Sequence, residues 1–326
     1  MHYLLGKLGL FVLTLWAAIT INFILPRLMP GSPADAAIAK LSQNGPVSPA
    51  MRASIEAQLG VPTGSLWDQY VTYLGQVVHF DFGPSFSYFP QSVSSLIGAA
   101  LPWTLVLVGT VTILAFVLGT LLGVLAAWKR GTALDTVPTV GGQFLSAFPY
   151  FWIALLLLFF FGYVAGWFPT SGAYSQTATP NWSWDFFTDA VYHGILPGLT
   201  ILLTAFGGWI IGMRNAMVNT LGEDYVTFAE ANGLRTRTVA LRYAARNAVL
   251  PQFTSFGMVL GGVVGGSLLV ETVFAYPGVG LLLFHAVTNQ DYPLMQALFL
   301  IITVSVLIAN FLVDILYGVL DPRTRR

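Results

Sequence analysis

The sequence predicts an all-α integral membrane protein that crosses the bilayer six times. Hydrophobic residues make up 56% of its 326 residues and charged residues only 9%, whereas soluble domains carry roughly 25% charged residues. Six windows each hold about the 20 apolar residues that a helix needs to cross a hydrocarbon core. These predicted spans are 8–27, 103–127, 138–162, 195–215, 252–275 and 293–318. We therefore treat residues 1–326 as one membrane domain.

The first predicted span has the outline of a secretory signal, because Lys7 precedes an apolar run. The run from Leu8 to Leu25 exceeds the usual apolar region of about 7–15 residues in such signals, and no small-x-small cleavage site follows it directly. We interpret this span as an uncleaved membrane anchor.

Two polar segments separate the spans on one side of the membrane. Residues 28–102 are rich in Pro, Gly and Ser, with turns predicted at 44–46 and 83–84 and a short helix predicted near Ala50–Leu59. Residues 166–194 form a second, shorter loop. Its aromatic residues are typical of side chains that anchor at the membrane interface, and contact with a substrate-binding protein or a sugar-like solute is the alternative. They are Trp182, Trp184, Phe186 and Phe187.

The basic residues predict the orientation of the chain. Eleven of the 14 Lys and Arg residues lie on one side of the membrane if the six spans alternate. Cytoplasmic loops carry an excess of Lys and Arg, so both termini are predicted to be cytoplasmic and residues 28–102 extracytoplasmic. The basic residues on the extracytoplasmic side are Arg27, Lys40 and Arg52.

Residues 216–251 form the one sizeable loop on the cytoplasmic side. Glu223 and Asp224 favour a helix N-terminus, and Gly233 can end that helix in a left-handed conformation. A second, basic helix is predicted to follow, and Pro251 to begin the fifth span. The basic residues of this second helix are Arg235, Arg237, Arg242 and Arg246. Taken alone, such a loop is most simply a solvated segment that fixes topology and contacts anionic lipid.

Motifs in this loop resemble the membrane subunits of bacterial ATP-binding cassette importers, specifically the dipeptide, oligopeptide and nickel permease family. In the loop these motifs are Glu223–Val226, Ala229–Ala231, Gly233-Leu234 and Arg246–Pro251. Further stretches that resemble the same family are Asp81–Ser85, Leu101–Leu105, Val270–Phe274, Tyr276–Gly280, Asp291–Pro293, Leu312–Asp314 and Leu320–Arg323. The resemblance covers most of the chain and is weakest in 28–80 and 166–194.

The resemblance implies a type I importer permease in which this loop forms a coupling helix. In such importers the helix docks in a groove of a separate ATP-hydrolysing subunit. Closure of two such subunits around nucleotide then moves the membrane subunits from an inward-facing to an outward-facing arrangement. The coupling candidates are Glu223, Asp224, Tyr225, Ala229, Glu230 and Gly233.

The resemblance also implies the partners of the chain. These are a second, homologous permease subunit, two ATPase subunits that hold ATP and Mg, an extracytoplasmic substrate-binding protein and membrane lipid, with no nucleic acid. The chain itself is then a transport subunit of the inner membrane, without enzymatic activity or a cofactor of its own. Di- or oligopeptides are the leading substrates, and oligosaccharides and nickel chelates are the alternatives.

The motifs and residue types of the sequence agree with a transport subunit whose ATPases are separate chains. No phosphate-binding G-x-x-x-x-G-K-[ST] loop occurs, because the pair Gly6-Lys7 is followed by Leu8. The chain has no cysteine, which excludes thiolate metal sites and a cysteine nucleophile, and its four histidines are dispersed without metal-binding spacing. No metal site is therefore expected.

Some positions depart from the family pattern. Thr227, Glu230 and Asn232 stand where relatives usually have basic residues. Tyr243 stands where histidine is common, and Gln290 stands where arginine is usual. These departures leave the fold expectation intact and bear on which ATPase and which substrate class the chain serves.

The fifth predicted span is rich in glycine, and its small-xxx-small spacing lets helices approach closely. In the family this span lies near a second membrane subunit and the central path, while packing within the chain is the alternative. Ionisable residues in spans are functional candidates by default, although Glu271, Asp314 and Arg214 all lie near span ends. We expect a structural or gating role for Glu271 and a structural or orientation role for Asp314. The pathway or gating candidates are Gly261, Gly265, Glu271 and Asp291.

Two other protein classes fit the sequence less well. An intramembrane serine protease would have to use Ser171, with His193 or His285 as the base, and nothing in the spacing brings either histidine near. An ion-driven secondary transporter requires acidic residues or broken helices at mid-membrane, and the span interiors are nearly free of acids.

Overall fold

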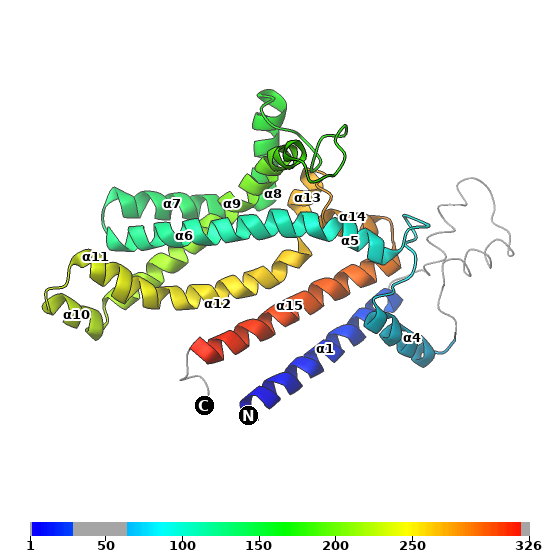
Figure 1. Ribbon diagram of the computed structural model, residues 1–326, viewed down its shortest axis with the longest axis horizontal. Helices are drawn as coiled ribbons and strands as arrows, with labels where there is room; N and C mark the ends of the chain where they lie inside the picture. Colours follow the sequence, from blue (N-terminus) through cyan, green and yellow to red (C-terminus); the bar gives the residue numbers. More distant parts are fainter. Residues whose placement is uncertain (1, 29–63, 321–326) are drawn as a thin grey trace.

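The computed structural model describes residues 2–28 and 64–320, which form an elongated bundle of helices (Figure 1). Within these ranges five helices are long and apolar enough to cross a membrane, and one bent pair can serve as a sixth span. No β-strand element occurs among the described residues, so the all-α prediction is confirmed. The helix predicted near Ala50–Leu59 and the turn predicted at 44–46 lie outside the described residues.

The helical elements follow one another with short connections. In chain order they are α1 (His2–Leu28), α4 (Leu66–His79), α5 (Val93–Thr104), η2 (Leu105–Gly109), α6 (Thr110–Trp128), α7 (Ala133–Ala147), α8 (Tyr150–Leu157), η3 (Leu158–Val164), α9 (Trp184–Leu221), α10 (Asp224–Ala231), α11 (Thr236–Thr238), η4 (Val239–Ala245), α12 (Arg246–Gly262), η5 (Val263–Gly265), α13 (Leu268–Val273), α14 (Val279–Thr288) and α15 (Tyr292–Leu320). Elements η2, η3 and η4 are π-helical turns, and η5 is a 3₁₀ turn.

Helices α1 and α15 pack against each other, and α4 crosses one end of α1 (Figure 1). Ser65 caps the first turn of α4, as serine does well at that position. The hydroxyl groups of Thr20 and Tyr70 are 2.7 Å apart, and Asn22 donates a hydrogen bond of 3.1 Å to Tyr73. These contacts fix α4 across the bundle. We call this end of the molecule the α4 end.

The second span is one continuous helix made of α5, η2 and α6. It begins at Val93 rather than at the predicted residue 103, because Ser92 accepts a hydrogen bond from Ser95 N and caps it. Pro102 lies inside this helix. Helix α6 approaches α9 closely, and a Cβ at Gly123 would lie 2.7 Å from the carbonyl oxygen of Ile210.

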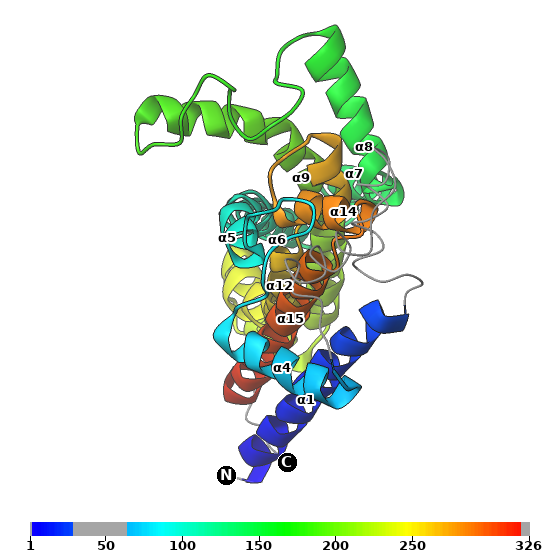
Figure 2. The ribbon, with the colours of Figure 1, turned by 90° about the vertical axis from the view of Figure 1, so that its right-hand side faces the viewer.

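The third predicted span, 138–162, is not a single helix. Helices α7 and α8 meet at an angle of 95°. The bend occurs at Phe148, whose φ of −82° and ψ of 139° are extended. A residue before proline is disfavoured in the helical region, and Pro149 follows. Helix α8 with η3 therefore leaves the line of the bundle, together with the start of α9 (Figure 2).

The tightest helix crossing joins α7 and α9 at Gly142 and Gly207, where a Cβ on Gly207 would overlap the carbonyl of Gly142. Replacing Gly207 by alanine is expected to lower the free energy of unfolding by about 1–3 kcal/mol, because an overpacked contact forces the backbones apart. A Cβ added at the adjacent Gly208 would meet nothing within 4 Å, so Gly208→Ala is the matched control.

The measurement is the thermal unfolding midpoint of each purified variant in the same detergent. Gly208→Ala should equal or exceed the native midpoint, since alanine favours helix over glycine by about 1 kcal/mol. Equal midpoints for the Gly207→Ala and Gly208→Ala variants would contradict the close α7–α9 crossing.

The prediction that Pro251 begins the fifth span is wrong. Pro251 lies inside α12, and the helical path is unbroken from Thr236 through Gly262. Proline removes one backbone hydrogen bond, and packing against neighbouring helices lets a membrane helix tolerate that loss. Helix α12 packs on α15 and α9.

The fifth span breaks near its end at the glycine-rich segment. Element η5 stops at Gly265, and Gly266 has a φ of +68°, a conformation that favours glycine. The short helix α13 follows, and then α14 turns back against α5 and α15.

Candidate functional site

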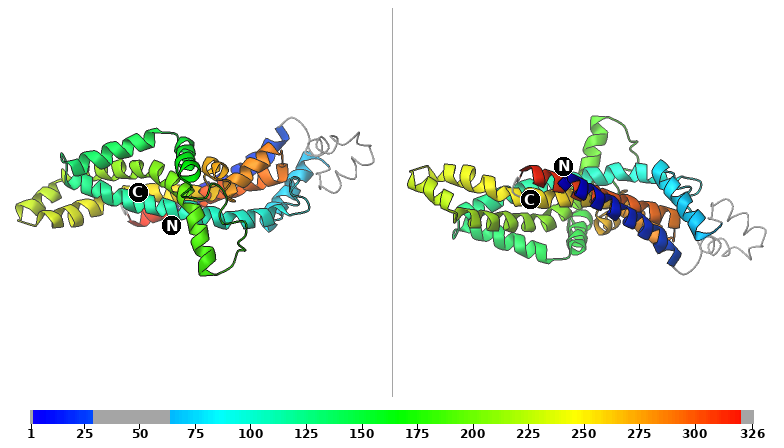
Figure 3. Two further views of the ribbon diagram at one scale, coloured as in Figure 1. Left: turned by 90° about the horizontal axis from the view of Figure 1, so that it is seen from above. Right: turned by 90° about the horizontal axis from the view of Figure 1, so that it is seen from below.

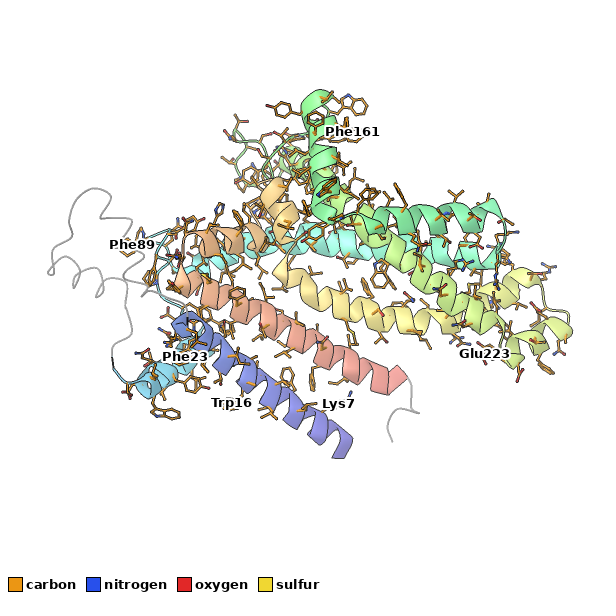
Figure 4. The ribbon with its side chains drawn as sticks, turned by 180° about the vertical axis from the view of Figure 1, so that it is seen from behind. Lys7, Trp16, Phe23, Phe89, Phe161 and Glu223 are labelled. Carbon is orange, nitrogen blue, oxygen red and sulfur yellow. The ribbon has the colours of Figure 1, made fainter. Side chains whose placement is uncertain are left out.

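The end of the molecule opposite α4 is formed by α10 and the turn that follows it (Figure 1). Glu223 occupies the N-cap position of α10, and Gly233 closes the helix with a φ of +76°. Both features confirm the helix and the glycine turn expected there. Figure 4 shows Glu223 at one extremity and Phe89 near the other. We call the segment 223–235 the α10 tip.

One face of α10 is buried against its own chain. Val226 and Ala229 pack with Val239 of η4 in an apolar cluster. Ala229, one of the coupling candidates, therefore holds α10 in place and does not face solvent. The Tyr225 hydroxyl accepts a hydrogen bond of 2.8 Å from Asn247 Nδ2. Helix α10 is thus attached to η4 and α12 at two points.

The opposite face of α10 is exposed and carries an apolar centre. Phe228 has 71% of its surface exposed, and the coupling candidate Asp224, one turn before it on the same side, is also exposed. The coupling candidates Glu223 and Glu230 are exposed elsewhere on the α10 tip. A Cβ at Gly233 would meet nothing within 4 Å. Phe228 was not among the predicted site residues. Its signal in the sequence is a large apolar residue two positions after Val226, which places it on the other side of the helix.

Arg214, near the end of α9, forms an ion pair with Asp135 of α7. The guanidinium donates two hydrogen bonds to the carboxylate, with Nε–Oδ1 and NH2–Oδ2 distances of 2.5 and 2.9 Å. Asp135 also accepts a hydrogen bond of 3.0 Å from Gly131 N. Two parallel hydrogen bonds of this type give a directional contact. This pair fixes α7 to α9.

Glu271 is fully buried at the break in the fifth span. Its carboxylate accepts hydrogen bonds from Thr104 Oγ1 at 3.0 Å and from Ser267 N at 3.4 Å. It also accepts from Gly280 N at 2.7 Å and Leu281 N at 3.2 Å. One side chain therefore satisfies backbone groups on both sides of the α13–α14 turn and contacts the second span.

The same carboxylate defines the start of α14. Two of its donors lie in the first turn of that helix, where N–H groups have no partner within the helix. Val279 N donates to Thr104 Oγ1 at 2.7 Å, which adds a third contact. A Cβ on Gly280 would lie 2.9 Å from Glu271 Oε2. The motifs around residues 101–105, 270–274 and 276–280 therefore meet at one point.

Asp291 is a second fully buried carboxylate, at the start of α15. It accepts hydrogen bonds from the hydroxyl of Ser85, from Ser87 N at 2.9 Å and from Leu294 N at 3.3 Å. Ser85 Oγ also accepts from Tyr88 N at 3.1 Å. Asp291 thus caps α15 and fixes the segment that carries the Asp81–Ser85 motif.

The glycines of the fifth span face two directions. A Cβ on Gly257 or Gly261 would run into α15, and one on Gly265 would lie 3.3 Å from Ile302 of the same helix. A Cβ on Gly262 would meet nothing within 4 Å. The side of the fifth span that carries Gly257, Gly261 and Gly265 therefore packs within the chain, and the side that carries Gly262 is left open.

An apolar cavity of about 1000 Å³ lies between the second span and the start of α9. Trp103 stacks on Tyr174 with ring centroids 5.5 Å apart and meets Tyr276 edge-on. Burial raises the pKa of Tyr276 to about 12, and the Glu271 carboxylate acts in the same direction, so the phenol stays neutral. The aromatic residues of the loop that line this cavity are Trp182, Trp184, Phe186 and Phe187.

Comparison with known proteins assigns these features to a family. Residues 119–326 match the family described as binding-protein-dependent transport system inner membrane component. The chain belongs to this family. It is therefore a multi-pass protein of the inner membrane and a transport permease. This family is neither a class of intramembrane proteases nor a class of ion-driven transporters.

Three relatives extend the similarity to the whole chain. The di/tripeptide transport system permease protein DppB of Pseudomonas aeruginosa is 33% identical, over 100% of this chain and 99% of the relative. The dipeptide transport system permease protein DppB of Escherichia coli is 32% identical over the same shares. The oligopeptide transport system permease protein AppB of Bacillus subtilis is 33% identical over 93% and 92%. Permeases named for peptide transport are thus similar to this chain from end to end.

Proposed function

We propose that the chain is the permease subunit of an ATP-driven importer that carries di- or oligopeptides from an extracytoplasmic binding protein into the cytoplasm. Family membership and the names of its relatives support peptide transport. The structure of the α10 tip is the observation that supports the ATP-driven mechanism. Its buried face is fixed to the chain, and on its exposed face the Phe228 side chain is largely uncovered by the residues that the structure describes.

The α10 tip has the composition of a protein docking surface. Interfaces combine an apolar anchor at the centre with a polar rim, and Phe228 with the exposed carboxylates of the α10 tip matches this pattern. The complementary groove on the ATPase subunit should be apolar at its centre and basic at its edge. Gly233 reverses the chain beside this surface without a side chain that would hold the partner away.

The basic residues support a cytoplasmic location for the α10 tip and both termini. Those of α11, η4 and α12 are exposed close to α10, and positive charge favours the cytoplasmic side. The start of α1 and the end of α15 lie away from the α4 end (Figure 1), so the α4 end is extracytoplasmic in this orientation. The binding protein then docks at the α4 end.

The remaining partners follow from the same proposal. Two ATPase subunits supply ATP and Mg, because this chain has no phosphate-binding loop. A second, homologous permease completes the membrane part, and the open side of α12 at Gly262 supports such a contact. Glu271 and Asp291 act as positioning residues that hold the starts of α14 and α15 at the extracytoplasmic side. Gly261 and Gly265 set the distance between α12 and α15.

The test is reconstitution of the complete complex in lipid nanodiscs and liposomes. ATP hydrolysis is measured with and without the binding protein, and uptake is measured with di- and oligopeptides, an oligosaccharide and a nickel chelate. Peptide-loaded binding protein should stimulate hydrolysis and drive peptide uptake. Failure to associate with any ATPase subunit would overturn the ATP-driven mechanism. Uptake of the sugar or the chelate alone would overturn the peptide assignment.

A further inference from the structure

Two separate membrane spans break at the same place in the fold. The bend between α7 and α8 lies at Phe148 and Pro149, and the fifth span breaks at Gly265 and Gly266. Both breaks line one cavity of about 600 Å³, and α9 forms the wall between them. Figure 3 shows α8 and α13 close together beside α9 when the molecule is seen from above.

Broken backbone at membrane depth requires a compensating environment. Non-helical segments are tolerated there only where they are buried in protein or line a cavity that holds polar groups. In the first turn of α8, the N–H groups of Trp152 and Ile153 donate to Pro149 O at 2.9 and 3.5 Å, and the two N–H groups before them have no acceptor within the helix. Transport proteins use such interrupted helices to present backbone groups to a substrate. The coincidence of two breaks on one cavity therefore indicates a binding function.

The side chains of this cavity define what it can bind. Ser146, Thr204 and Ser267 contribute hydroxyl groups, and Phe148, Ile201 and Leu268 contribute apolar surface. No lining residue carries a charge. A charged ligand group would lose its hydration without gaining a counter-charge. Uncharged amide groups, by contrast, can exchange hydrogen bonds with hydroxyl and backbone groups.

We propose that this cavity is a binding site for the main chain of the transported peptide. The inference rests on the proposed peptide transport and specifies where this subunit contacts the substrate. Peptide N–H and C=O groups pair with the hydroxyl groups of the cavity. The charged termini and the variable side chains of the peptide extend away from the uncharged lining, so affinity depends little on side-chain charge. A volume of about 600 Å³ falls in the range of about 300–1,000 Å³ that is typical of ligand pockets.

The absence of cysteine from the chain allows a direct test on the complete complex. Ser267→Cys and Ser146→Cys each place one thiol in the cavity and conserve side-chain size. Ala190→Cys is the control, because Ala190 is on α9 but lines the larger apolar cavity. Labelling by a water-soluble maleimide is followed on this chain after denaturing electrophoresis, during ATP turnover with binding protein. The peptides added are trialanine, trilysine and triglutamate.

The expected result is protection of both cavity thiols by each peptide that the native complex takes up. At about nine times the half-saturating peptide concentration, the labelling rate should fall about tenfold, in proportion to the free fraction of sites. The Ala190→Cys rate should not change. Labelling that transported peptides leave unaltered would overturn the site while the proposed function stands. Protection by only one of the three transported peptides would overturn main-chain recognition. A native complex that takes up no peptide would overturn both.

Discussion

Replacing Phe228 by alanine is expected to remove most of the ATP hydrolysis that the binding protein stimulates, while the chain still folds. Phe228 is 71% exposed and lies on the face of α10 that its own chain does not cover. Substitutions at such exposed positions usually change the free energy of unfolding by less than about 0.5 kcal/mol. An aromatic anchor of an interface, by contrast, contributes about 2 kcal/mol or more, which is roughly a 30-fold change in affinity.

A matched control for Phe228 exists at the other end of the molecule. Val78 of α4 is 73% exposed, and Val78→Ala also truncates an exposed apolar side chain on a short helix. The experiment compares ATPase association by pull-down for the two variants, and it compares stimulated hydrolysis and peptide uptake of Phe228→Ala with those of the native complex. Phe228→Ala should lose association and uptake, whereas Val78→Ala should keep its ATPase association. If Phe228→Ala keeps the native levels of ATPase association and stimulated hydrolysis, the α10 tip is not a docking surface.

Replacing Glu271 by alanine is expected to lower the free energy of unfolding by about 3–5 kcal/mol. Four donors bind its carboxylate, and each buried donor left without an acceptor costs about 1–3 kcal/mol before relaxation. The loss is comparable to breaking a buried ion pair. The first turn of α14 would lose the acceptor of Gly280 N and Leu281 N, and the Thr104 hydroxyl of the second span would keep only its hydrogen bond from Val279 N.

The glutamine variant separates hydrogen bonding from charge at this position. Glu271→Gln keeps one acceptor oxygen for Gly280 and Leu281, and the Thr104 hydroxyl can rotate to accept from the new amide. Its stability should therefore lie between native and Glu271→Ala. Asp185→Ala, at an exposed acidic residue in the first turn of α9, controls for loss of a carboxylate. Thermal midpoints of the purified chain in detergent rank the variants, and equal midpoints for the Asp185→Ala and Glu271→Ala variants would contradict the proposed role.

Composition and apolar length were sufficient to predict the spans. A run of about 20 apolar residues has few alternatives in a membrane protein, and each predicted window falls within or overlaps a helical segment of the structure. The boundaries were less predictable. The second span extends to Val93 because Ser92 caps it, and hydropathy does not detect a cap.

The two broken spans were not predictable from apolar windows, because hydropathy averages over the break. Phe148-Pro149 lies within an apolar run, and the glycines at 265 and 266 resemble a packing motif. Whether proline breaks a helix depends on its surroundings, since Pro251 and Pro102 lie inside continuous helices. Among the classes considered, broken helices were expected only of an ion-driven transporter. This chain has broken helices but belongs to the binding-protein-dependent transport family, so broken helices do not identify an ion-driven transporter here.

The chemistry of the candidate site was predicted in part. The acidic start of α10 and its glycine end follow from local rules that need no tertiary contact. The partners of Glu271 and Asp291 lie up to about 200 residues away in the chain, so one sequence identifies each carboxylate but not what it binds. Phe228 was missed because an apolar residue in a short amphipathic helix is expected to face inward.

The continuous helical path from Thr236 to Gly262 has a mechanical consequence. At a rise of 1.5 Å per residue this helical path is roughly 40 Å long. It contacts α10 at one end and leads to the glycine break at the other. A continuous helix resists bending, so a displacement of its α10 end is passed along the axis to its other end. A tilt imposed at the α10 tip would therefore be released at Gly266, where rotation about φ and ψ meets little steric resistance. Force applied at one membrane surface would thus become a rearrangement of α13 and α14 near the other.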